Sequence, residues 1–211
     1  TVQVSAYPTA YDQWEAGAEL LITELGDGIG SSSCGAGTIS GEMALPLDQP
    51  YQWTSGYGPR EINVPGASTW HAAIDLQNWP GNCGAPVYAI LPGEVVLSSG
   101  LWLSVKHPDG FVVSYLHMYK SDRLVDVGDQ VAAGQQIGKV GNVPPSGGCH
   151  LDLRINVAGN TNPEVAKLTL SQNETRMRPA TLPEHQNFVD PEQFMQLWSV
   201  DVCPTDWCRR L

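Results

Sequence analysis

The chain has 211 residues, which is enough for one domain with extensions and short for two. Its 22 acidic and 11 basic residues give a formal charge of −11, which argues against nucleic acid as a partner and against binding an anionic polymer through bulk charge. No apolar run is long enough to span a bilayer, and the first residues lack the basic and apolar regions of a signal peptide. We therefore expect a monomeric exported protein, or an exported segment of a longer chain.

Residues 1–41 are predicted to form an arm ahead of the main domain. Apolar residues recur at spacings of three and four between Tyr11 and Leu25, which indicates a short amphipathic helix. The run at 28–37 is rich in glycine and serine, as is typical of a flexible linker. Two arrangements remain open: an arm reaching from a preceding module, or a helix docked on the main domain and held there through Cys34.

Residues 42–198 are predicted to form one domain with an all-β core. Helical periodicity is absent between residues 45 and 157, and short apolar runs are bounded there by glycine and proline. Pro108 and Gly110 indicate a hairpin turn between two of these runs. The predicted strands cover residues 70–76, 87–90, 94–97, 102–106, 112–117 and 150–155.

Three of these strands carry a histidine on the polar face. His71 and Asp75 are four residues apart and His150 and Asp152 are two apart, so each pair should point to one side of its strand. In the third strand the same alternation places the side chains of Tyr115, His117 and Tyr119 on one face. Three histidines and two aspartates in phase on strands could converge on one cation.

Beyond the last of these strands, residues 158–187 show little periodicity. We interpret them as a long insertion that walls one side of a substrate groove. Asp190 and Pro191 have the residue types of an N-cap and a first helical position, which predicts a short helix over 191–198. Residues 199–211 are left as a tail that contains two cysteines.

The order of the motifs resembles that of the lysostaphin/LytM-type zinc metallopeptidases, the M23 family of the LAS group. The resemblance covers about residues 45–157, and residues 188–191 are similar to the family's closing motif. It implies a mainly β fold of the duplicated hybrid motif type, an antiparallel sheet groove with zinc at its floor, and hydrolysis of peptides of bacterial peptidoglycan. The matching segments are Thr54–Arg60, His71–Asp75, Pro86–Ala89, Gly93–Val96, Tyr115–His117, Val127–Val131, Gly134–Gly138 and Cys149–Asp152.

The resemblance also implies a role for each site residue. His71 and Asp75 would be zinc ligands, and His117 and His150 would be the catalytic pair. The family's third ligand is the second histidine of a His-x-His pair, and here that position is Asp152. An aspartate oxygen lies two bonds from Cβ, as does Nδ1 of histidine, so Asp152 can present an oxygen near the same point. The predicted metal set is therefore His71, Asp75 and Asp152.

The aspartate at this position has consequences for the metal and for the function. One imidazole and two carboxylates cancel the charge of zinc, so we expect a single zinc ion bound more weakly than at a two-histidine site. The alternative is that Asp152 pairs with Arg154 or His150 and the site holds no metal. Two functions follow: a zinc endopeptidase acting on peptidoglycan, or a catalytically degenerate module acting as a wall-binding or scaffold component of an envelope assembly.

Two further residues are candidates for substrate contacts. Tyr115 could donate a hydrogen bond to the oxyanion formed during peptide hydrolysis, although a tyrosine on a strand more often packs, which is the interpretation we prefer. Arg60, in a Gly-Pro-Arg turn, could hold a substrate carboxylate, although we prefer the interpretation that it braces its own loop.

Five cysteines indicate disulfides and hence an oxidising compartment outside the cytoplasm, at the cell envelope or beyond it. If the two metal-binding stretches meet at one cation, Cys83 and Cys149 are neighbours and a disulfide between them would staple the rim of the site. Cys203 and Cys208 can pair locally, and a bond from Cys34 to either of them is the alternative.

Overall fold

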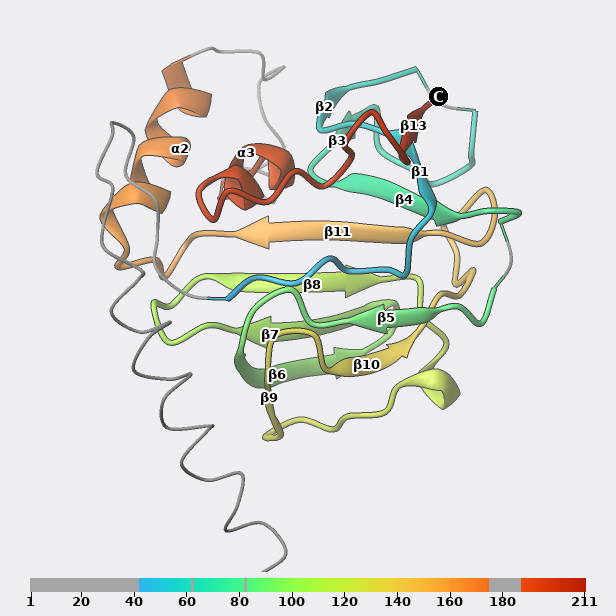
Figure 1. Cartoon of the computed structure of the whole chain (residues 1–211), viewed down its shortest axis with the longest axis horizontal. Helices are drawn as coiled ribbons and strands as arrows, with labels where there is room; N and C mark the ends of the chain where they lie inside the picture. The colour runs from blue at the N-terminus through green and yellow to red at the C-terminus, as the bar shows by residue number, and fades with distance from the viewer. Residues whose placement is uncertain (1–41, 62, 82, 175–186) are drawn as a thin grey trace, which may run out of the picture. The chain divides into compact units, whose positions relative to one another are not determined.

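The computed structural model describes residues 42–61, 63–81, 83–174 and 187–211 (Figure 1). The predicted helix and linker of residues 1–41, and Cys34 with them, lie outside these residues. The strands are β1 Tyr51–Ser55, β2 Gly58–Pro59, β3 Trp70–His71, β4 Ile74–Asn78, β5 Pro86–Tyr88, β6 Gly93–Ser99, β7 Trp102–Lys106, β8 Val112–Leu116, β9 Gln130–Val131, β10 Gln136–Lys139, β11 Leu151–Asn156, β12 Phe188–Val189 and β13 Arg209–Arg210. The helices are the 3₁₀ turn η1 Lys120–Asp122 and the α-helices α2 Pro163–Glu174 and α3 Pro191–Gln196.

The fold is mainly β, as predicted. In the part of the chain that is described, the main sheet has the order β13-β1-β4-β11-β8-β7-β6-β9, and Figure 1 shows β4, β11, β8 and β7 side by side. All its pairs are antiparallel except β1 with β13. Two small sheets, β2 with β3 and β5 with β10, accompany it.

The hairpin between β7 and β8 confirms the predicted turn. The Gly110 N–H donates to the His107 carbonyl, and Gly110 has a φ of 89°, a conformation that residues with a side chain rarely adopt. A side chain at Gly110 would also meet the carbonyl oxygen of Gly159 at 2.0 Å. Only glycine therefore allows this turn to pack against the segment after β11.

β11 lies near the middle of the sheet and separates the core from the polar face. Leu151, Leu153 and Ile155 are fully buried in the core, while Asp152 and Arg154 line a cleft on the other side. This is the alternation predicted for residues 150–155, and it follows from the period of two along a strand. β11 pairs with β4 along one edge of its first half, with β12 further along, and with β8 on the other edge.

The predicted helix after Asp190 is confirmed as α3. The Asp190 carboxylate accepts a hydrogen bond from the Glu192 N–H, and Pro191 opens the helix. Phe194 and Met195 are fully buried in the core, so packing rather than length stabilises this six-residue helix.

Within the insertion predicted for residues 158–187, residues 163–174 form the helix α2, which the weak periodicity of this stretch did not predict. The Asn162 side chain accepts a hydrogen bond from the Glu164 N–H, and Pro163 is the first helical residue. These are the same start signals as those of α3. The helix is held by Val165, which is fully buried, and by Leu168, which packs against the core.

The C-terminal tail is joined to the sheet. β13 pairs with β1, and the Leu211 N–H donates to the Trp53 carbonyl. Cys203 and Cys208 form a disulfide, which confirms the local pairing. None of the helices in the described part of the chain is long and apolar enough to cross a membrane.

Candidate metal centre

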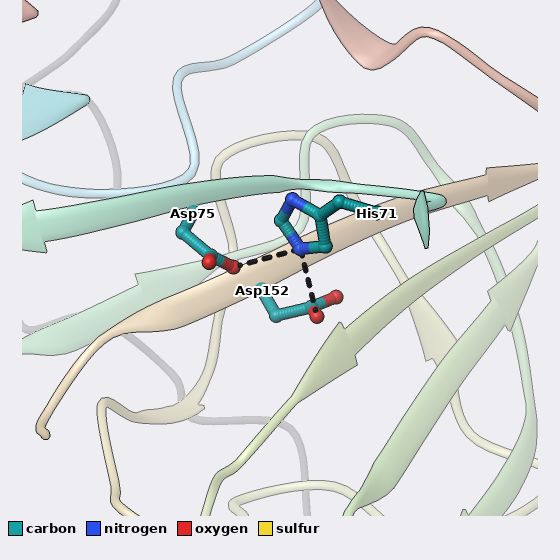
Figure 2. Close-up of side chains that lie close together, drawn as sticks. All are labelled: His71, Asp75 and Asp152. Carbon is teal, nitrogen blue, oxygen red and sulfur yellow. Dashed lines mark hydrogen bonds and ion pairs between the residues drawn. The ribbon is translucent and has the colours of Figure 1, made fainter. Parts of the chain in front are cut away.

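His71, Asp75 and Asp152 meet on the polar face of the main sheet (Figure 2). Asp75 on β4 and Asp152 on β11 are direct partners in the antiparallel register, so their side chains point to the same side. His71 ends β3 and reaches in from the neighbouring two-stranded sheet. Two carboxylates opposite each other repel unless a cation lies between them.

The path of the chain into this site differs from the predicted one. A single strand over residues 70–76 was expected to carry both His71 and Asp75. Instead Ala72 and Ala73, both fully buried, separate β3 from β4. β3 pairs with β2, whereas β4 pairs with β1 and β11. The two side chains meet because the chain bends between them, and the even spacing alone does not explain it.

The interatomic distances suit a small cation. His71 Nε2 lies 3.2 Å from Asp75 Oδ1 and 3.4 Å from Asp152 Oδ2. Ligands at 2.0–2.2 Å from one tetrahedral zinc ion are about 3.4 Å from each other. His71 Nδ1 is 2.9 Å from the Gly56 carbonyl oxygen, which can only accept, so Nδ1 carries the hydrogen and the Nε2 lone pair of the neutral ring faces the carboxylates.

Asp75 Oδ1 gives the clearest indication that the centre is built for a cation. When His71 and His150 turn an Nε2 lone pair to the centre, this buried oxygen accepts no hydrogen bond from any described residue, and its one replacement for a metal is protonated His71, whose Nε2 lies 3.2 Å away. A buried carboxylate oxygen without a partner is costly, and a metal ion removes that cost. A nitrogen and two carboxylate oxygens are also ligands that zinc accepts. The residues present therefore fit a divalent metal.

Without a metal, the two carboxylates act on the His71 imidazole. Burial alone would lower the pKa of His71, but the nearby carboxylates of Asp152 and Asp75 outweigh it and raise the pKa to about 9. In the metal-free protein at neutral pH, His71 is therefore protonated and occupies the centre with a positive charge. A metal ion has to displace that proton.

The metal-free protein should lose about 3 kcal/mol of unfolding free energy as the pH rises from about 6.5 to 9. The pKa of His71 is higher in the folded than in the unfolded chain, so the stabilisation is complete below about pH 6.5 and lost above about pH 9. Urea unfolding of chelator-treated protein across this range measures it. His71→Asn is the control, and its unfolding free energy should not show this loss between about pH 6.5 and about pH 9. If the unfolding free energy of the wild type changes with pH no more than that of the control, the raised pKa of His71 is contradicted.

His117 and His150 flank the cluster. His150 Nε2 lies 3.5 Å from Asp75 Oδ1, and His117 Nε2 lies 3.9 Å from Asp152 Oδ2. The Nδ1 atoms lie 2.8 Å and 2.6 Å from backbone carbonyl oxygens, of Gly148 and Val143 respectively. Each ring therefore carries its hydrogen on Nδ1 and turns the Nε2 lone pair towards the centre.

The position of His117 could not be read from strand alternation. β8 ends at Leu116, which lines the cleft, so regular alternation would turn the next side chain into the core. His117 instead has a φ of 71°, which returns its ring to the cleft side. Its backbone N–H donates to Leu101 and its carbonyl accepts from Val143, and these bonds offset the strain of this conformation.

Of the two interpretations of Tyr115, packing is confirmed and the oxyanion role is wrong. Tyr115 pairs with Leu153 across the sheet, so its side chain lies on the core face and is fully buried. Its hydroxyl accepts the backbone N–H of Ile90, and burial raises the pKa of the phenol further above its usual range. The alternation that placed Tyr115 with His117 fails at the end of β8.

Each carboxylate of the centre is held by an arginine. Arg60 Nη1 donates to Asp75 Oδ2 and Ser55 Oγ, and its Nε donates to the Ser68 carbonyl. These contacts agree with the bracing role and also orient Asp75. Arg154 donates to both oxygens of Asp152, as expected if the two residues pair. Burial opposes the charge on Asp152, but Arg154 holds the pKa of this carboxyl well below its usual range.

The centre lies at the floor of an open cleft with a volume of about 730 Å³. The segments 64–68, 101–102 and 145–148 contribute to its walls. The described residues of the 158–187 insertion do not line it. Cys83 and Cys149 form the predicted disulfide, and Gln77 donates to the Cys149 carbonyl next to His150.

The fold and this centre agree with the family relationship. Residues 69–163 match the sequence profile of Peptidase family M23. Among curated proteins, it is 30% identical over 129 residues to the peptidoglycan DD-endopeptidase ShyC of Vibrio cholerae. That match covers 58% of this chain and 29% of the relative, so the chain corresponds to less than a third of that protein.

Solved structures show the same fold. The catalytic domain of the antimicrobial peptidase lysostaphin from Staphylococcus simulans superposes with a TM-score of 0.50 at 25% identity, covering 69% of this chain and 92% of that domain. A longer lysostaphin structure has a TM-score of 0.52 at 24% identity, covering 77% of this chain and 61% of the other. The predicted family and fold class are confirmed.

Proposed function

We propose that this chain is a zinc-dependent endopeptidase that hydrolyses peptide bonds of bacterial peptidoglycan. One observation carries the proposal. His71 Nε2, Asp75 Oδ1 and Asp152 Oδ2 face one another at the floor of an open cleft, and Asp75 Oδ1 is buried without a hydrogen bond. This arrangement suits a metal that can also meet a substrate.

His71, Asp75 and Asp152 would hold the zinc ion. When bound, zinc supplies an acidified water as nucleophile and polarises the scissile carbonyl. The carbonyl of Gly56 keeps His71 in the tautomer whose Nε2 can ligate, and Arg60 fixes the orientation of Asp75.

His117 and His150 would handle protons in the reaction. Burial lowers the pKa of His117, so its ring is neutral at pH 7 and its Nε2 can accept a proton from the attacking water. Once protonated, the same nitrogen can donate to the departing amine. His150 Nε2 lies across the centre, with the two ring centroids 4.7 Å apart, and its lone pair can also accept a proton; only after it has done so could Nε2–H donate a hydrogen bond to the developing oxyanion.

The proposed substrate and compartment rest on the relatives and on the disulfides. The curated relative is described as a peptidoglycan DD-endopeptidase, and the cleft is open enough to admit an extended peptide. The two disulfides are typical of proteins outside the cytoplasm, where peptidoglycan lies.

A catalytically degenerate module is the second candidate, and the bidentate ion pair of Asp152 with Arg154 is the observation in its favour. The flanking histidines argue against it. A module that only binds or assembles needs neither His117 nor His150 in the tautomer that faces the centre, and both rings are held in that tautomer by backbone carbonyls.

Zinc titration together with a hydrolysis assay tests the proposal. Protein purified without a nickel column and stripped with chelator should bind one zinc ion per chain and then release soluble peptides from purified peptidoglycan. Asp75→Ala should lose both properties, because it removes a ligand oxygen. Release by zinc-loaded wild type that does not exceed release by Asp75→Ala would leave the degenerate module as the better description.

A further inference from the structure

We propose that Arg154 is the resident counter-ion of Asp152, and that the two side chains act as one charge-neutral unit at the position where the family carries a neutral histidine. The inference rests on the metal binding assumed in the proposed function. It follows that replacing Asp152 by histidine should not strengthen zinc binding unless the charge of Arg154 is removed at the same time.

The contact between the two side chains is direct and two-pronged. Arg154 Nε lies 2.7 Å from Asp152 Oδ1, and Nη2 lies 2.8 Å from Oδ2. Parallel bonds of this kind fix both the distance and the orientation of a carboxylate. Asp152 is only 2% exposed, so little of this attraction is screened by water.

The guanidinium is also held from other directions. Arg154 follows Asp152 by two residues on β11, which puts both on the cleft face. Its Cζ lies 5.2 Å from the centre of the Trp102 ring, within the range of a cation–π contact. Arginine stays protonated at any accessible pH, so this positive charge is permanent.

Counting charges shows why the pair matters for a metal. Asp75 and Asp152 carry two negative charges, and Arg60 and Arg154, which contact them, carry two positive charges. In the state that binds the metal, where His71 has lost its proton and the histidines are neutral, these four charges sum to zero. Histidine in place of Asp152 would leave Arg154 unpaired and make the sum +1, which repels a divalent cation. Removing the charge at 154 as well returns the sum to zero.

Arg154 does not consume the whole capacity of Asp152. A carboxylate oxygen can accept two partners, and Oδ2 faces both Arg154 Nη2 and His71 Nε2, at 2.8 Å and 3.4 Å. The ion pair with Arg154 and the predicted ligand role of Asp152, which residue spacing leaves as alternatives, are therefore compatible. Arg154 is a positioning residue that acts through Asp152.

The test is a double-mutant cycle in zinc affinity, with Asp152→His, Arg154→Gln and the double variant. Competition with a chromophoric chelator gives the zinc Kd of each. We expect Asp152→His alone to bind zinc at least tenfold more weakly than the double variant. Arg154→Gln alone should bind zinc more tightly than wild type, since it leaves an extra negative charge. Thermal unfolding without metal should show a lower Tm for Arg154→Gln than for wild type.

Arg154→Lys is the matched control, because it keeps the charge and loses the two-pronged contact. Asp152→His/Arg154→Lys should bind zinc as weakly as Asp152→His. This comparison stands even if the single Arg154→Gln variant does not fold. Equal zinc affinities for Asp152→His with arginine, lysine or glutamine at 154 would overturn the inference. If these zinc affinities are equal but the wild type still hydrolyses peptidoglycan, only the inference about Arg154 is refuted. If the zinc affinity of Asp152→His depends on residue 154 but the wild type does not hydrolyse peptidoglycan, only the proposed activity is refuted.

Discussion

Replacing His117 by alanine should lower kcat for peptidoglycan hydrolysis by about 10²–10⁴-fold while the protein still binds one zinc ion. The ring lies outside the cluster formed by His71, Asp75 and Asp152, yet its Nε2 is 3.9 Å from Asp152 Oδ2. We therefore infer that His117 moves protons and is not a ligand. His150→Ala should behave in the same way, because its Nε2 faces Asp75.

Zinc content and steady-state kinetics on the same preparations separate the two roles. Substitution of a ligand, as in His71→Ala, should lower both zinc content and activity and serves as the contrast. Since burial lowers the pKa of His117, activity should be retained down to a lower pH than an ordinary histidine base would allow. A His117→Ala protein that no longer retains zinc would show that His117 is a ligand.

Removing the Cys83–Cys149 disulfide should cost about 4 kcal/mol of unfolding free energy, because the bond closes a loop between residues 66 apart. The bond also ties the loop after β4 to the residue that precedes His150. Gln77, which donates to the Cys149 carbonyl, adds a second connection at the same place. Zinc affinity should therefore fall together with stability in Cys83→Ala/Cys149→Ala.

The second disulfide provides the control in the same molecule. Cys203 and Cys208 are 5 residues apart, so Cys203→Ala/Cys208→Ala should cost about 2 kcal/mol and leave zinc affinity unchanged. Denaturant unfolding of both variants, each with Cys34 replaced by serine to prevent exchange, gives the comparison. Equal losses of stability, or equal losses of zinc affinity, would contradict the rim role of Cys83–Cys149.

Several features of this protein were determined by local sequence, because their physical causes act within a few residues. The alternation that buries Leu151, Leu153 and Ile155 and exposes Asp152 to the cleft follows from the strand period. Asp190 starts α3 through a hydrogen bond two residues along the chain. Asn162 offers the same kind of start signal for α2, but the residues after it have only a weak apolar periodicity, so no helix was predicted there.

Other predictions came from the order of many motifs, which together specify the family. They placed His71, Asp75, His117, His150 and Asp152 around one centre, and the structure brings these side chains together. The pairing of Cys83 with Cys149 followed from that convergence and is confirmed.

Only the tertiary structure decided how the side chains reach the centre. The bend at Ala72–Ala73, the positive φ of His117 and the burial of Tyr115 all depend on segments far away in the sequence. For example, the carbonyl of His117 packs so closely on Gly141 that a side chain there would meet it at 2.4 Å. Local propensity contains no information on such contacts.

The same holds for the charge balance of the centre. The sequence set Asp152 and Arg154 two residues apart on one face of a strand, which allows an ion pair but does not require it. From the sequence alone, metal binding by Asp152 and its pairing with Arg154 were alternatives. The structure shows Oδ2 within reach of both Arg154 and His71, because β4 and β11 bring the two carboxylates opposite each other beneath the imidazole. Burial strengthens these interactions between charges, and burial is a property of the folded chain that residue spacing does not reveal.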